Sequence, residues 1–399
     1  MITRIFIPIL FAIILPDLYL YLRFIRRVAD KGRKRRRAVA LLLPSAVMVL
    51  ATVGLVASRE FAPRDFSLMN IYLLLLALLV IPKCVFVLCS SIGHLCSRLV
   101  RLAFGIRQRP ARNYGNILGL LLVATIWYVA IYGSTAGFQQ VKVRHVEYAS
   151  PDLPESFDGY RIVHFSDVHA GTYGTGRQWL LQEFVDSINS QDADAIMFTG
   201  DLQNRTPDEL LPHTTILGSL KSRDGVYSVL GNHDYANYIT ADEATKRSNE
   251  LKTIALERQM GWKLLVNENV TIRRDSDSIV VAGMANDGDG VHFPQLGDIR
   301  STLRGVGDSA FVVMLQHDPS SWRRKILPAS QAQLTLSGHT HAMQFGLFGW
   351  SPASWVYTEW GGLFHEGSRA INVSTGMGGF IPFRFGMPGE IVVVTLRKK

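Results

Sequence analysis

Hydrophobic runs divide the chain into two parts with different patterns. The first third contains four apolar stretches of roughly 20 residues, the length of helix that crosses the hydrocarbon core of a bilayer. These stretches are Ile2–Leu22, Ala38–Ala57, Leu68–Cys89 and Ile117–Ser134. We therefore predict an all-α transmembrane region of about four helices over residues 1–136, followed by a second domain over residues 137–399.

In the second part, short apolar runs end in polar, Gly-rich turns. Residues Gln139 to Tyr148 alternate apolar and polar positions, as a half-buried strand does. Eight further runs are predicted as strands: Tyr160–Phe165, Ala195–Phe198, Val226–Leu230, Ile279–Ala282, Phe311–Leu315, Gln333–Leu336, Ala370–Val373 and Ile391–Thr395. Helical segments fall between several of them. Strands interleaved with helices indicate a layered α/β domain.

Helix starts are visible at two places in this domain. Thr206-Pro-Asp-Glu209 and Thr240-Ala-Asp-Glu243 both fit a capping box, in which the Thr and the Glu satisfy free N–H groups of the first turn. Another helix is predicted after Thr175. Apolar residues spaced four apart define its buried face: Leu180, Phe184 and Ile188.

The net charge of +9 is distributed unevenly. Residues 1–150 contain 20 Lys/Arg and 5 Asp/Glu, whereas residues 151–399 contain 22 and 28. The distal domain thus lacks the basic surface of a polyanion-binding protein, and we expect no nucleic-acid partner. All three cysteines, Cys84, Cys89 and Cys96, lie in or beside an apolar stretch. The distal domain therefore has no disulfide framework and no thiolate metal site.

Two basic loops predict the orientation in the membrane. The segment from Arg23 to Arg37 contains nine Lys/Arg and one Asp, and the segment from Arg98 to Arg112 contains five Arg and no acid. The loop between the second and third stretches balances two Arg with two acids. The positive-inside rule places both basic loops in the cytoplasm. The chain is then a multi-pass integral membrane protein whose distal domain is extracytoplasmic, on the periplasmic or extracellular side.

Two features of the membrane part have alternative interpretations. Asp17 lies within the first stretch; an intramembrane carboxylate is costly and suggests a function, but it can also lie near the interface or pair with another helix. The segment Ser91–Phe104 places three leucines opposite Arg98 and Arg101. This pattern fits a helix on the inner membrane surface, and a solvated loop is the alternative.

Five predicted strands end in side chains that can bind metal. Asp167 and His169 follow the strand that ends at Phe165, and Asp201 follows the one that ends at Phe198. Asn232, His233 and Asp234 follow the strand that ends at Leu230. His317 follows the strand that ends at Leu315, and His339 and His341 follow the one that ends at Leu336. Sheets of α/β proteins place ligand sites at these carboxyl ends. A single Asp-x-His is weak evidence, because a lone buried His is more often structural. Five such ends together are not plausibly accidental.

The candidate metal ligands are Asp167, His169, Asp201, Asn232, His317, His339 and His341. Four imidazoles, two carboxylates and an amide without sulfur suit Mn, Fe or Zn, and contain too much nitrogen for Ca or Mg. One carboxylate can bridge two ions roughly 3.5–4 Å apart. Two divalent ions would acidify a shared water to hydroxide and hold the oxygens of an in-line phosphoryl displacement.

The ordered motifs Asp-x-His, Gly-Asp, Gly-Asn-His-Asp, His and Gly-His-x-His resemble the calcineurin-like metallophosphoesterase superfamily, in its membrane-associated branch. They span about Val141 to Leu396. The resemblance implies a four-layer sandwich of two β-sheets flanked by helices. It also implies that Asp201 bridges two metals, one held by Asp167, His169 and His341 and the other by Asn232, His317 and His339.

The same resemblance implies catalytic roles for two residues. His233 would act near the leaving-group oxygen as a general acid or charge stabiliser, oriented by Asp234. One departure concerns Gln203 and Asn204, which stand where the family often has an acid or Asn soon after Gly-Asp. The resemblance therefore does not assign the residues that surround the ligands. Because none of the ligands is lost, a degenerate, binding-only homologue is disfavoured.

An aromatic run follows the last predicted ligand. It contains Phe345, Phe348, Trp350, Trp355, Tyr357, Trp360 and Phe364. These residues could pack a hairpin, or they could form an apolar lip for lipid tails, since Trp favours membrane interfaces. Better-understood relatives in the membrane-associated branch cleave phosphate esters of lipids or nucleotide-linked lipids. We therefore expect a membrane-anchored phosphoesterase of a lipid or lipid-linked substrate; a phosphatase of soluble esters and a non-catalytic sensor are the alternatives.

Overall fold

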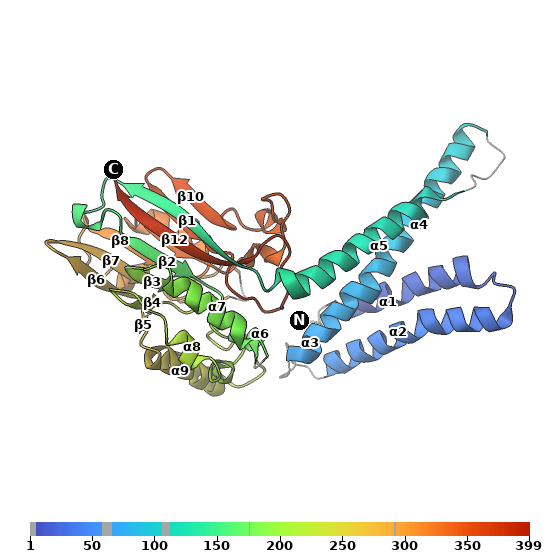
Figure 1. Ribbon diagram of the computed structural model, residues 1–399, viewed down its shortest axis with the longest axis horizontal. Coiled ribbons are helices and arrows are strands. Elements are labelled where there is room, and N and C mark those ends of the chain that lie inside the picture. Colours follow the sequence, from blue (N-terminus) through green and yellow to red (C-terminus); the bar gives the residue numbers. More distant parts are fainter. Residues whose placement is uncertain (1–4, 58–65, 106–111, 175, 291–292) are drawn as a thin grey trace. The chain divides into compact units, whose positions relative to one another are not determined.

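The chain forms two compact units, Met1–Ser134 and Thr135–Lys399 (Figure 1). The structure, a computed structural model, describes residues 5–57, 66–105, 112–174, 176–290 and 293–399. Part of the second basic loop, including Arg107 and Arg109, and the loop between the second and third apolar stretches lie outside these residues. The two units are described separately.

The first unit is all helical. Its segments are α1 (Phe6–Leu20), η2 (Tyr21–Ile25), α2 (Lys31–Ala57), α3 (Phe66–Leu75), η3 (Leu76–Val80), α4 (Ile81–Ala103), α5 (Tyr114–Tyr132) and η4 (Gly133–Gly137). Within the described residues, four helical stretches are long and apolar enough to cross a membrane, as predicted. The third runs from Ser67 to Ala103, so the segment Ser91–Phe104 continues the third span as helix, and its interpretation as a solvated loop is wrong.

The intramembrane carboxylate is paired with a neighbouring helix. The Lys83 ammonium lies 2.7 Å from the Asp17 carboxylate and also donates a 2.8 Å hydrogen bond to the Ser45 hydroxyl. Both ends of this contact are shielded, with Asp17 almost fully buried. Of the alternatives for Asp17, the structure shows pairing with another helix.

The second unit contains two six-stranded sheets. The first has the order β1 (Val141–Ser150), β12 (Gly389–Lys398), β2 (Arg161–Phe165), β3 (Ala195–Phe198), β4 (Val226–Ser228), β5 (Lys263–Leu264). The second has the order β10 (Gly362–Glu366), β11 (Arg369–Val373), β9 (Leu334–Ser337), β8 (Phe311–Leu315), β7 (Asp277–Gly283), β6 (Glu268–Arg274). Strands β2 to β5 are mutually parallel, as are β11, β9, β8 and β7.

Alternating side chains bury both faces of the first sheet. In β2, Ile162 points into the core between the sheets, whereas Val163 and Phe165 pack on the outer face under the helices. A third apolar cluster, which includes Trp322, covers the outer face of the second sheet. The result is the predicted four-layer order of helices, sheet, sheet and helices (Figure 1).

Helices and turns complete the outer layers. They are α6 (Ala170–Tyr173), α7 (Gln178–Asn189), α8 (Thr214–Leu217), α9 (Glu243–Gln259), α10 (Ile299–Thr302) and α11 (Leu327–Ala329), with short turns η5 (Glu155–Phe157), η6 (Pro207–Leu210), η7 (Trp322–Ile326), η8 (His341–Gln344) and η9 (Pro352–Trp355). Helix α7 buries the predicted face of Leu180, Phe184 and Ile188. Thr175, the predicted start of this helix, lies outside the described residues.

One of the two predicted helix starts is wrong. The capping box of Thr206 and Glu209 is present and begins the short turn η6. At Thr240, however, the helix begins two residues later than predicted, because the Asp242 carboxylate accepts the Thr245 N–H at 2.7 Å and is the cap. All nine predicted strands are present. Three more were not predicted, β5, β6 and β10, which are very short or largely polar.

Candidate active site

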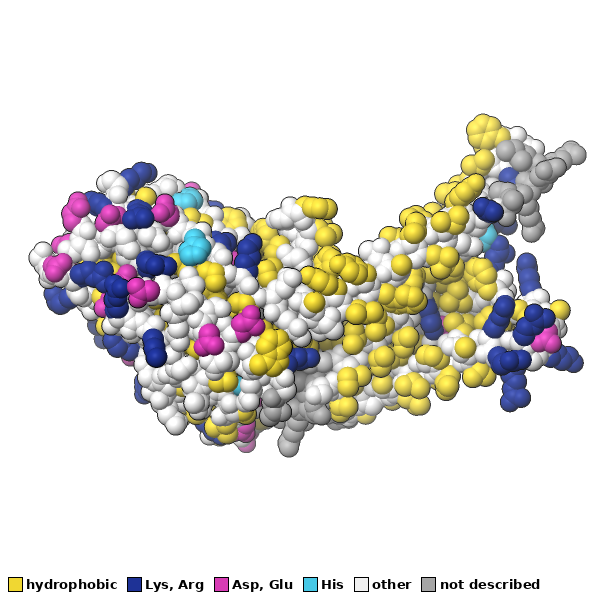
Figure 2. All heavy atoms as spheres, viewed as in Figure 1, with side chains coloured by type: hydrophobic (Ala, Val, Ile, Leu, Met, Phe, Trp, Pro, Cys, Tyr) yellow, Lys and Arg dark blue, Asp and Glu magenta, His cyan; other side chains and the backbone are white. Residues whose placement is uncertain are grey.

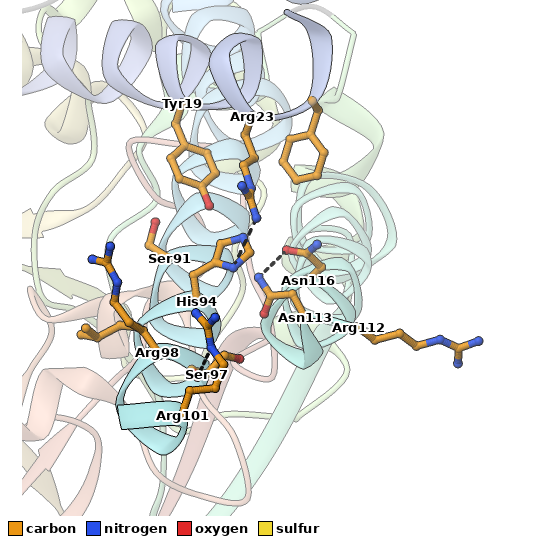
Figure 3. Close-up of a pocket in the computed structure, with 12 residues that line it drawn as sticks. Tyr19, Arg23, Ser91, His94, Ser97, Arg98, Arg101, Arg112, Asn113 and Asn116 are labelled. Atoms are coloured by element: carbon orange, nitrogen blue, oxygen red, sulfur yellow. Dashed lines mark hydrogen bonds between the residues drawn. The ribbon is translucent and has the colours of Figure 1, made fainter. Parts of the chain in front are cut away.

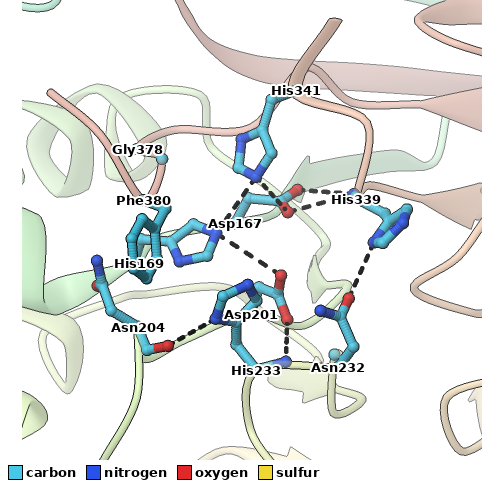
Figure 4. A network of polar contacts seen from close by, with 12 residues as sticks. Asp167, His169, Asp201, Asn204, Asn232, His233, His339, His341, Gly378 and Phe380 are labelled. Atoms are coloured by element: carbon cyan, nitrogen blue, oxygen red, sulfur yellow. Dashed lines mark hydrogen bonds and ion pairs between the residues drawn. The ribbon is translucent and has the colours of Figure 1, made fainter. Parts of the chain in front are cut away.

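All seven predicted metal ligands converge at the carboxyl ends of the central strands (Figure 4). Strands β2, β3 and β4 of the first sheet position Asp167, His169, Asp201 and Asn232, and strands β8 and β9 of the second sheet position His317, His339 and His341. Both sheets therefore contribute to one site. Because parallel strands bring their carboxyl ends to the same edge, residues up to 174 positions apart in the chain meet here.

The first group of ligand atoms surrounds one point. The Nε2 atoms of His169 and His341 lie 3.2 Å apart, and His341 Nε2 lies 3.3 Å from the Asp167 carboxylate. The Asp201 carboxylate lies 3.6 Å from His169 Nε2. Two ring nitrogens and two carboxylates aimed at a common point form a suitable donor set for a divalent cation.

A second group shares Asp201 with the first. Its carboxylate lies 3.3 Å from His317 Nε2, and the Asn232 side-chain oxygen lies 3.1 Å from the same nitrogen. His339 presents Nδ1 to this group, 2.9 Å from the Asn232 oxygen and 3.3 Å from His317 Nε2. Asp201 therefore stands between the two groups of ligands.

Outer hydrogen bonds determine which ring nitrogens face the site. His317 donates Nδ1–H to the Thr199 carbonyl at 2.7 Å, which directs its Nε2 inward. His339 uses its other nitrogen, Nε2, in a 3.2 Å hydrogen bond with the Tyr357 hydroxyl. Both rings are thus oriented as metal ligands usually are, with one nitrogen held by the protein and the other free for the ion.

The electrostatics of the site favour positive charge. Burial lowers the pKa of His169 to about 3, so its ring is neutral at pH 7 and keeps a lone pair. Burial alone would raise the pKa of Asp201, but the His317 and His233 rings hold it well below its usual value. Although burial opposes it, the Asp201 carboxylate raises the pKa of His317 to about 10. Among the described residues, no Lys or Arg forms an ion pair with Asp167 or Asp201, and the residues fit divalent cations.

The ligand residues have an unusual backbone. Positive φ angles occur at Asp167 (55°), His169 (49°), Asp201 (60°), His339 (74°) and His341 (49°). This left-handed region is unfavourable for residues other than glycine, and such strain gathers at functional sites where the surrounding fold enforces it. The backbone is therefore bent to aim these side chains at the site.

Glycines between the ligands allow the loops to pack this closely. A Cβ on Gly338 would lie 2.0 Å from the Ser166 hydroxyl and 2.4 Å from the Asp167 carboxylate. A Cβ on Gly231 would lie 2.2 Å from the Asp201 carboxylate. The Gly in each of the Gly-Asn-His-Asp and Gly-His-x-His motifs is thus required because only hydrogen fits there.

Each unit of the chain matches a known protein family. The family described as calcineurin-like phosphoesterase matches residues 160–343, and the one described as a probable calcineurin-like phosphoesterase transmembrane domain matches residues 3–138. The uncharacterized metallophosphoesterase YkuE of Bacillus subtilis is 30% identical over 265 residues, which cover 61% of this chain and 82% of YkuE. The chain belongs to the calcineurin-like metallophosphoesterases. It is a membrane protein and a phosphoric ester hydrolase that uses divalent metal.

Two other relatives share most of this metallophosphoesterase. A Danio rerio protein named transmembrane protein with metallophosphoesterase domain is 29% identical over 343 residues, which cover 84% of this chain and 73% of the relative. The UDP-2,3-diacylglucosamine pyrophosphatase LpxG of Chlamydia trachomatis is 27% identical over 298 residues, which cover 61% of this chain and 86% of LpxG. The first similarity extends into the membrane region, as its length requires.

His233 lies beside the ligand cluster, but Asp234 does not orient it. The His233 Nδ1 atom forms a 2.6 Å hydrogen bond with the Asn204 carbonyl (Figure 4). The Asp234 carboxylate instead accepts the backbone N–H groups of Gly231, Asp201 and the two residues after Asp201. The predicted contact between Asp234 and His233 is therefore wrong. The Asp234 carboxylate satisfies these backbone N–H groups instead, and it thereby connects the loop of Asp201 to the loop of Gly231.

Other residues at the site were missed from the sequence. Tyr238 stacks on the His233 ring with centroids 4.1 Å apart, and its hydroxyl accepts from the Asn232 amide at 2.7 Å. Phe380 packs on His233 from the loop after β11. Buried Arg384 holds that loop by donating to the carbonyls of Thr375 and Gly376, both at 2.8 Å. The Gly-rich end of β11 was the available signal, but it carries no metal-binding side chain.

The aromatic run after His341 is partly packed and partly exposed. Phe345 stacks on Phe385 with centroids 5.6 Å apart, as the hairpin interpretation requires. Phe348 is fully exposed, and Trp355 is 78% exposed although it contacts Trp350. Tyr357, near the end of the run, reaches back to the ligand His339. The run therefore combines an internal anchor with an apolar surface joined to the site.

Proposed function

We propose that this metallophosphoesterase is a binuclear hydrolase of the phosphate ester of a lipid or lipid-linked substrate. The observation that carries the proposal is the exposed aromatic surface of Phe348 and Trp355, on the same segment as Tyr357, which bonds the ligand His339. LpxG, a relative whose name gives a diacylated substrate, supports the same substrate class.

Two ions of Mn, Fe or Zn fit the two ligand groups. In this proposal Asp201 would serve both ions, because its carboxylate faces His169 on one side and His317 on the other. Asp167, His169 and His341 would complete one ion's ligands, and Asn232, His317 and His339 the other's. When bound, two such ions supply an acidified water and neutralise charge on the phosphoryl oxygens.

The surrounding residues position the ester and move the proton. The Asn204 carbonyl fixes His233 through Nδ1, so the opposite nitrogen, Nε2, is available to the leaving-group oxygen. Tyr238 and Phe380 hold the ring between them. Asp234 acts as a positioning residue, since it ties the Asp201 loop to the Gly231 loop and thereby sets the place of the bridging carboxylate.

The substrate class can be tested with detergent-purified full-length protein and Mn²⁺. Hydrolysis of phospholipid esters in mixed micelles is compared with hydrolysis of a water-soluble p-nitrophenyl phosphodiester. We expect Phe348→Ser/Trp355→Ser to lower turnover of the micellar lipid about tenfold or more and to leave the soluble ester unaffected. Trp179→Ser is the control, because this Trp is also exposed, at 51%, but lies on α7, away from the aromatic run in the sequence.

Three results would contradict the proposal. Equal loss on both substrates would show that the two aromatic residues only stabilise the fold. Turnover of soluble esters without lipid turnover would favour the phosphatase of soluble substrates. Absence of any hydrolysis by metal-loaded wild-type protein would favour a sensor.

We further propose that the metal site is extracytoplasmic. The positive-inside rule assigns the basic segments between α1 and α2 and between α4 and α5 to the cytoplasm. A reporter fused after Lys399 tests this side directly. Strong alkaline phosphatase activity with weak fluorescent-protein signal is expected, and the reverse pattern would place the site inside.

A further inference from the structure

A second polar site lies within the helical unit. A cavity of about 710 Å³ opens between the end of α1 with η2, the second half of α4 and the start of α5 (Figure 3). It belongs entirely to the first unit and shares no residue with the metal ligands. Its lining is strongly basic. Because charged side chains are costly beside membrane-spanning helices, this concentration of charge suggests a function.

The charge in this pocket is not neutralised by the protein. Arg23, Arg98 and Arg101 line it together with His94, and no Asp or Glu is among the lining residues. Arg112 is at its edge and extends away from the other side chains (Figure 3). Among the described residues, none of these arginines forms an ion pair with a carboxylate. The pocket therefore concentrates positive charge that an anion can neutralise.

The arginines retain donors for a ligand. Arg23 donates one hydrogen bond, to His94 Nδ1 at 3.4 Å, and Arg101 donates Nε–H to the Ser97 carbonyl at 3.2 Å (Figure 3). Each guanidinium has five N–H groups in a planar fork that matches phosphate oxygens. These contacts use one group of each side chain and hold the fork in place.

The helices that form two walls of the pocket are closely packed. The α4 and α5 backbones meet at Gly93 and Gly115, where a Cβ on Gly93 would lie 2.1 Å from the Asn113 side-chain oxygen. Asn113 caps α5 by accepting the Gly115 N–H at 3.0 Å and donates to the Ser90 carbonyl at 2.9 Å. Small residues at a helix crossing allow such close packing in membranes. The basic groups therefore project from a fixed frame.

The surface beside the pocket indicates a lipid ligand. Leu95, Leu99 and Leu102 are exposed on α4, and Leu95 also lines the pocket together with Arg98 and Arg101. In Figure 2 the flanks of the helical unit are apolar, and Lys and Arg side chains gather at the end where its basic loops lie. A free phosphate would need only the arginines. A phospholipid would place its phosphate in the pocket and its acyl chains along the exposed leucines.

We propose that this pocket binds the phosphate headgroup of an anionic phospholipid through Arg23 and Arg101. The bound lipid is distinct from the substrate of the metal site, because the pocket lies wholly in the helical unit and shares no residue with the metal ligands. The inference thus goes beyond the proposed catalytic function and does not depend on it.

Native mass spectrometry of the full-length protein in detergent tests this site. Phosphatidylglycerol is titrated against phosphatidylcholine. We expect wild type to retain phosphatidylglycerol selectively and Arg23→Gln/Arg101→Gln to bind it about tenfold more weakly. Arg35→Gln/Arg36→Gln removes the same charge from exposed positions of α2 and should bind like wild type. Unchanged hydrolysis of a soluble phosphoester by each variant shows that the metal unit is intact.

Hydrogen exchange in the wild type provides a test without substitution. Phosphatidylglycerol nanodiscs should slow exchange over residues 91–103 and 113–116 relative to phosphatidylcholine nanodiscs. Equal weakening by both double variants would show a general attraction of basic loops to anionic lipid and overturn the pocket. Equal exchange in the two nanodiscs would also overturn it. Protection by inorganic phosphate but not by phosphatidylglycerol would overturn the lipid assignment.

Discussion

The buried carboxylate of Asp17 in the helical unit and those of Asp167 and Asp201 at the metal site have different partners. In the helical unit, the Asp17 carboxylate meets the Lys83 ammonium at 2.7 Å, and a Ser45 hydroxyl completes the contact. In the metallophosphoesterase unit, Asp167 and Asp201 face histidine rings, with no described Lys or Arg in ion-pair contact. The first carboxylate is neutralised by the chain itself, and the other two require a cation from outside.

A fourth buried carboxylate is neutralised in another way. Glu257 on α9 is fully buried, accepts a hydrogen bond from the Ser228 hydroxyl, and has one oxygen without a partner among the described residues. Burial and then the nearby Asp234 raise its pKa well above the usual value, so a proton neutralises it. A buried carboxylate is thus neutralised by a Lys at Asp17, by a proton at Glu257, and by a cation from outside at Asp167 and Asp201. The first two positions are structural, and the last two belong to the candidate active site. Four substitutions test this distinction.

The largest effect is expected at Asp201. Asp201→Asn should lower turnover by about 10³-fold or more and release at least one metal equivalent, because this carboxylate serves both ligand groups. Metal analysis and hydrolysis of a soluble phosphoester measure both quantities. Asp192→Asn, at a largely exposed position, should change neither. Two tightly held metals with wild-type turnover in the Asp201 variant would contradict its bridging role.

His233→Ala should slow hydrolysis by roughly 10²–10⁴-fold, the scale of general acid–base catalysis, while the metal content stays near that of wild type. His233 bonds Asn204 through Nδ1, and its ring lies beside His169. Metal analysis separates this result from that of Asp201→Asn. Loss of metal from the His233 variant would identify the ring as a ligand.

Lys83→Ala should destabilise the helical unit by about 3 kcal/mol, because it leaves the Asp17 carboxylate buried and unpaired. Asp17→Asn in the same chain should recover most of that loss. Unfolding in a mixed-detergent titration measures both variants, and the metal content reports the other unit. A single variant as stable as wild type would show that Asp17 reaches water or lipid headgroups instead.

Glu257→Gln should have the smallest effect, and it should depend on pH. Because the folded-state pKa is raised, the folded form keeps a proton that the unfolded chain releases, so wild-type stability falls as pH rises above the unfolded carboxyl pKa of about 4.3. We expect the variant to be about 1–2 kcal/mol more stable than wild type at pH 8 and close to it at pH 5. Equal pH dependence in thermal unfolding would show that Glu257 is ionised in the folded state.

The local pattern of the sequence was sufficient to predict which strand ends carry the candidate ligands. Each of the apolar runs that became β2, β3, β4, β8 and β9 ends in Asp, Asn or His, and strands of a parallel sheet bring such ends together. The four spans were equally visible, since membrane helices need long apolar stretches. These predictions depend on periodicity and residue type over a few neighbours, which the sequence states directly.

Contacts between distant segments were decided only by the tertiary structure. The family resemblance implied that Asp234 orients His233, yet the Asn204 carbonyl, 29 positions away, forms the hydrogen bond with the ring. Arg23 and Arg101 appeared only as charges that orient two loops, until the packing of α1, α4 and α5 brought them to one cavity. Residue type and spacing along the chain determine strands, spans and ligand chemistry. Which backbone carbonyl meets a side chain, and which charges share a pocket, depends on packing between elements that the local pattern does not encode.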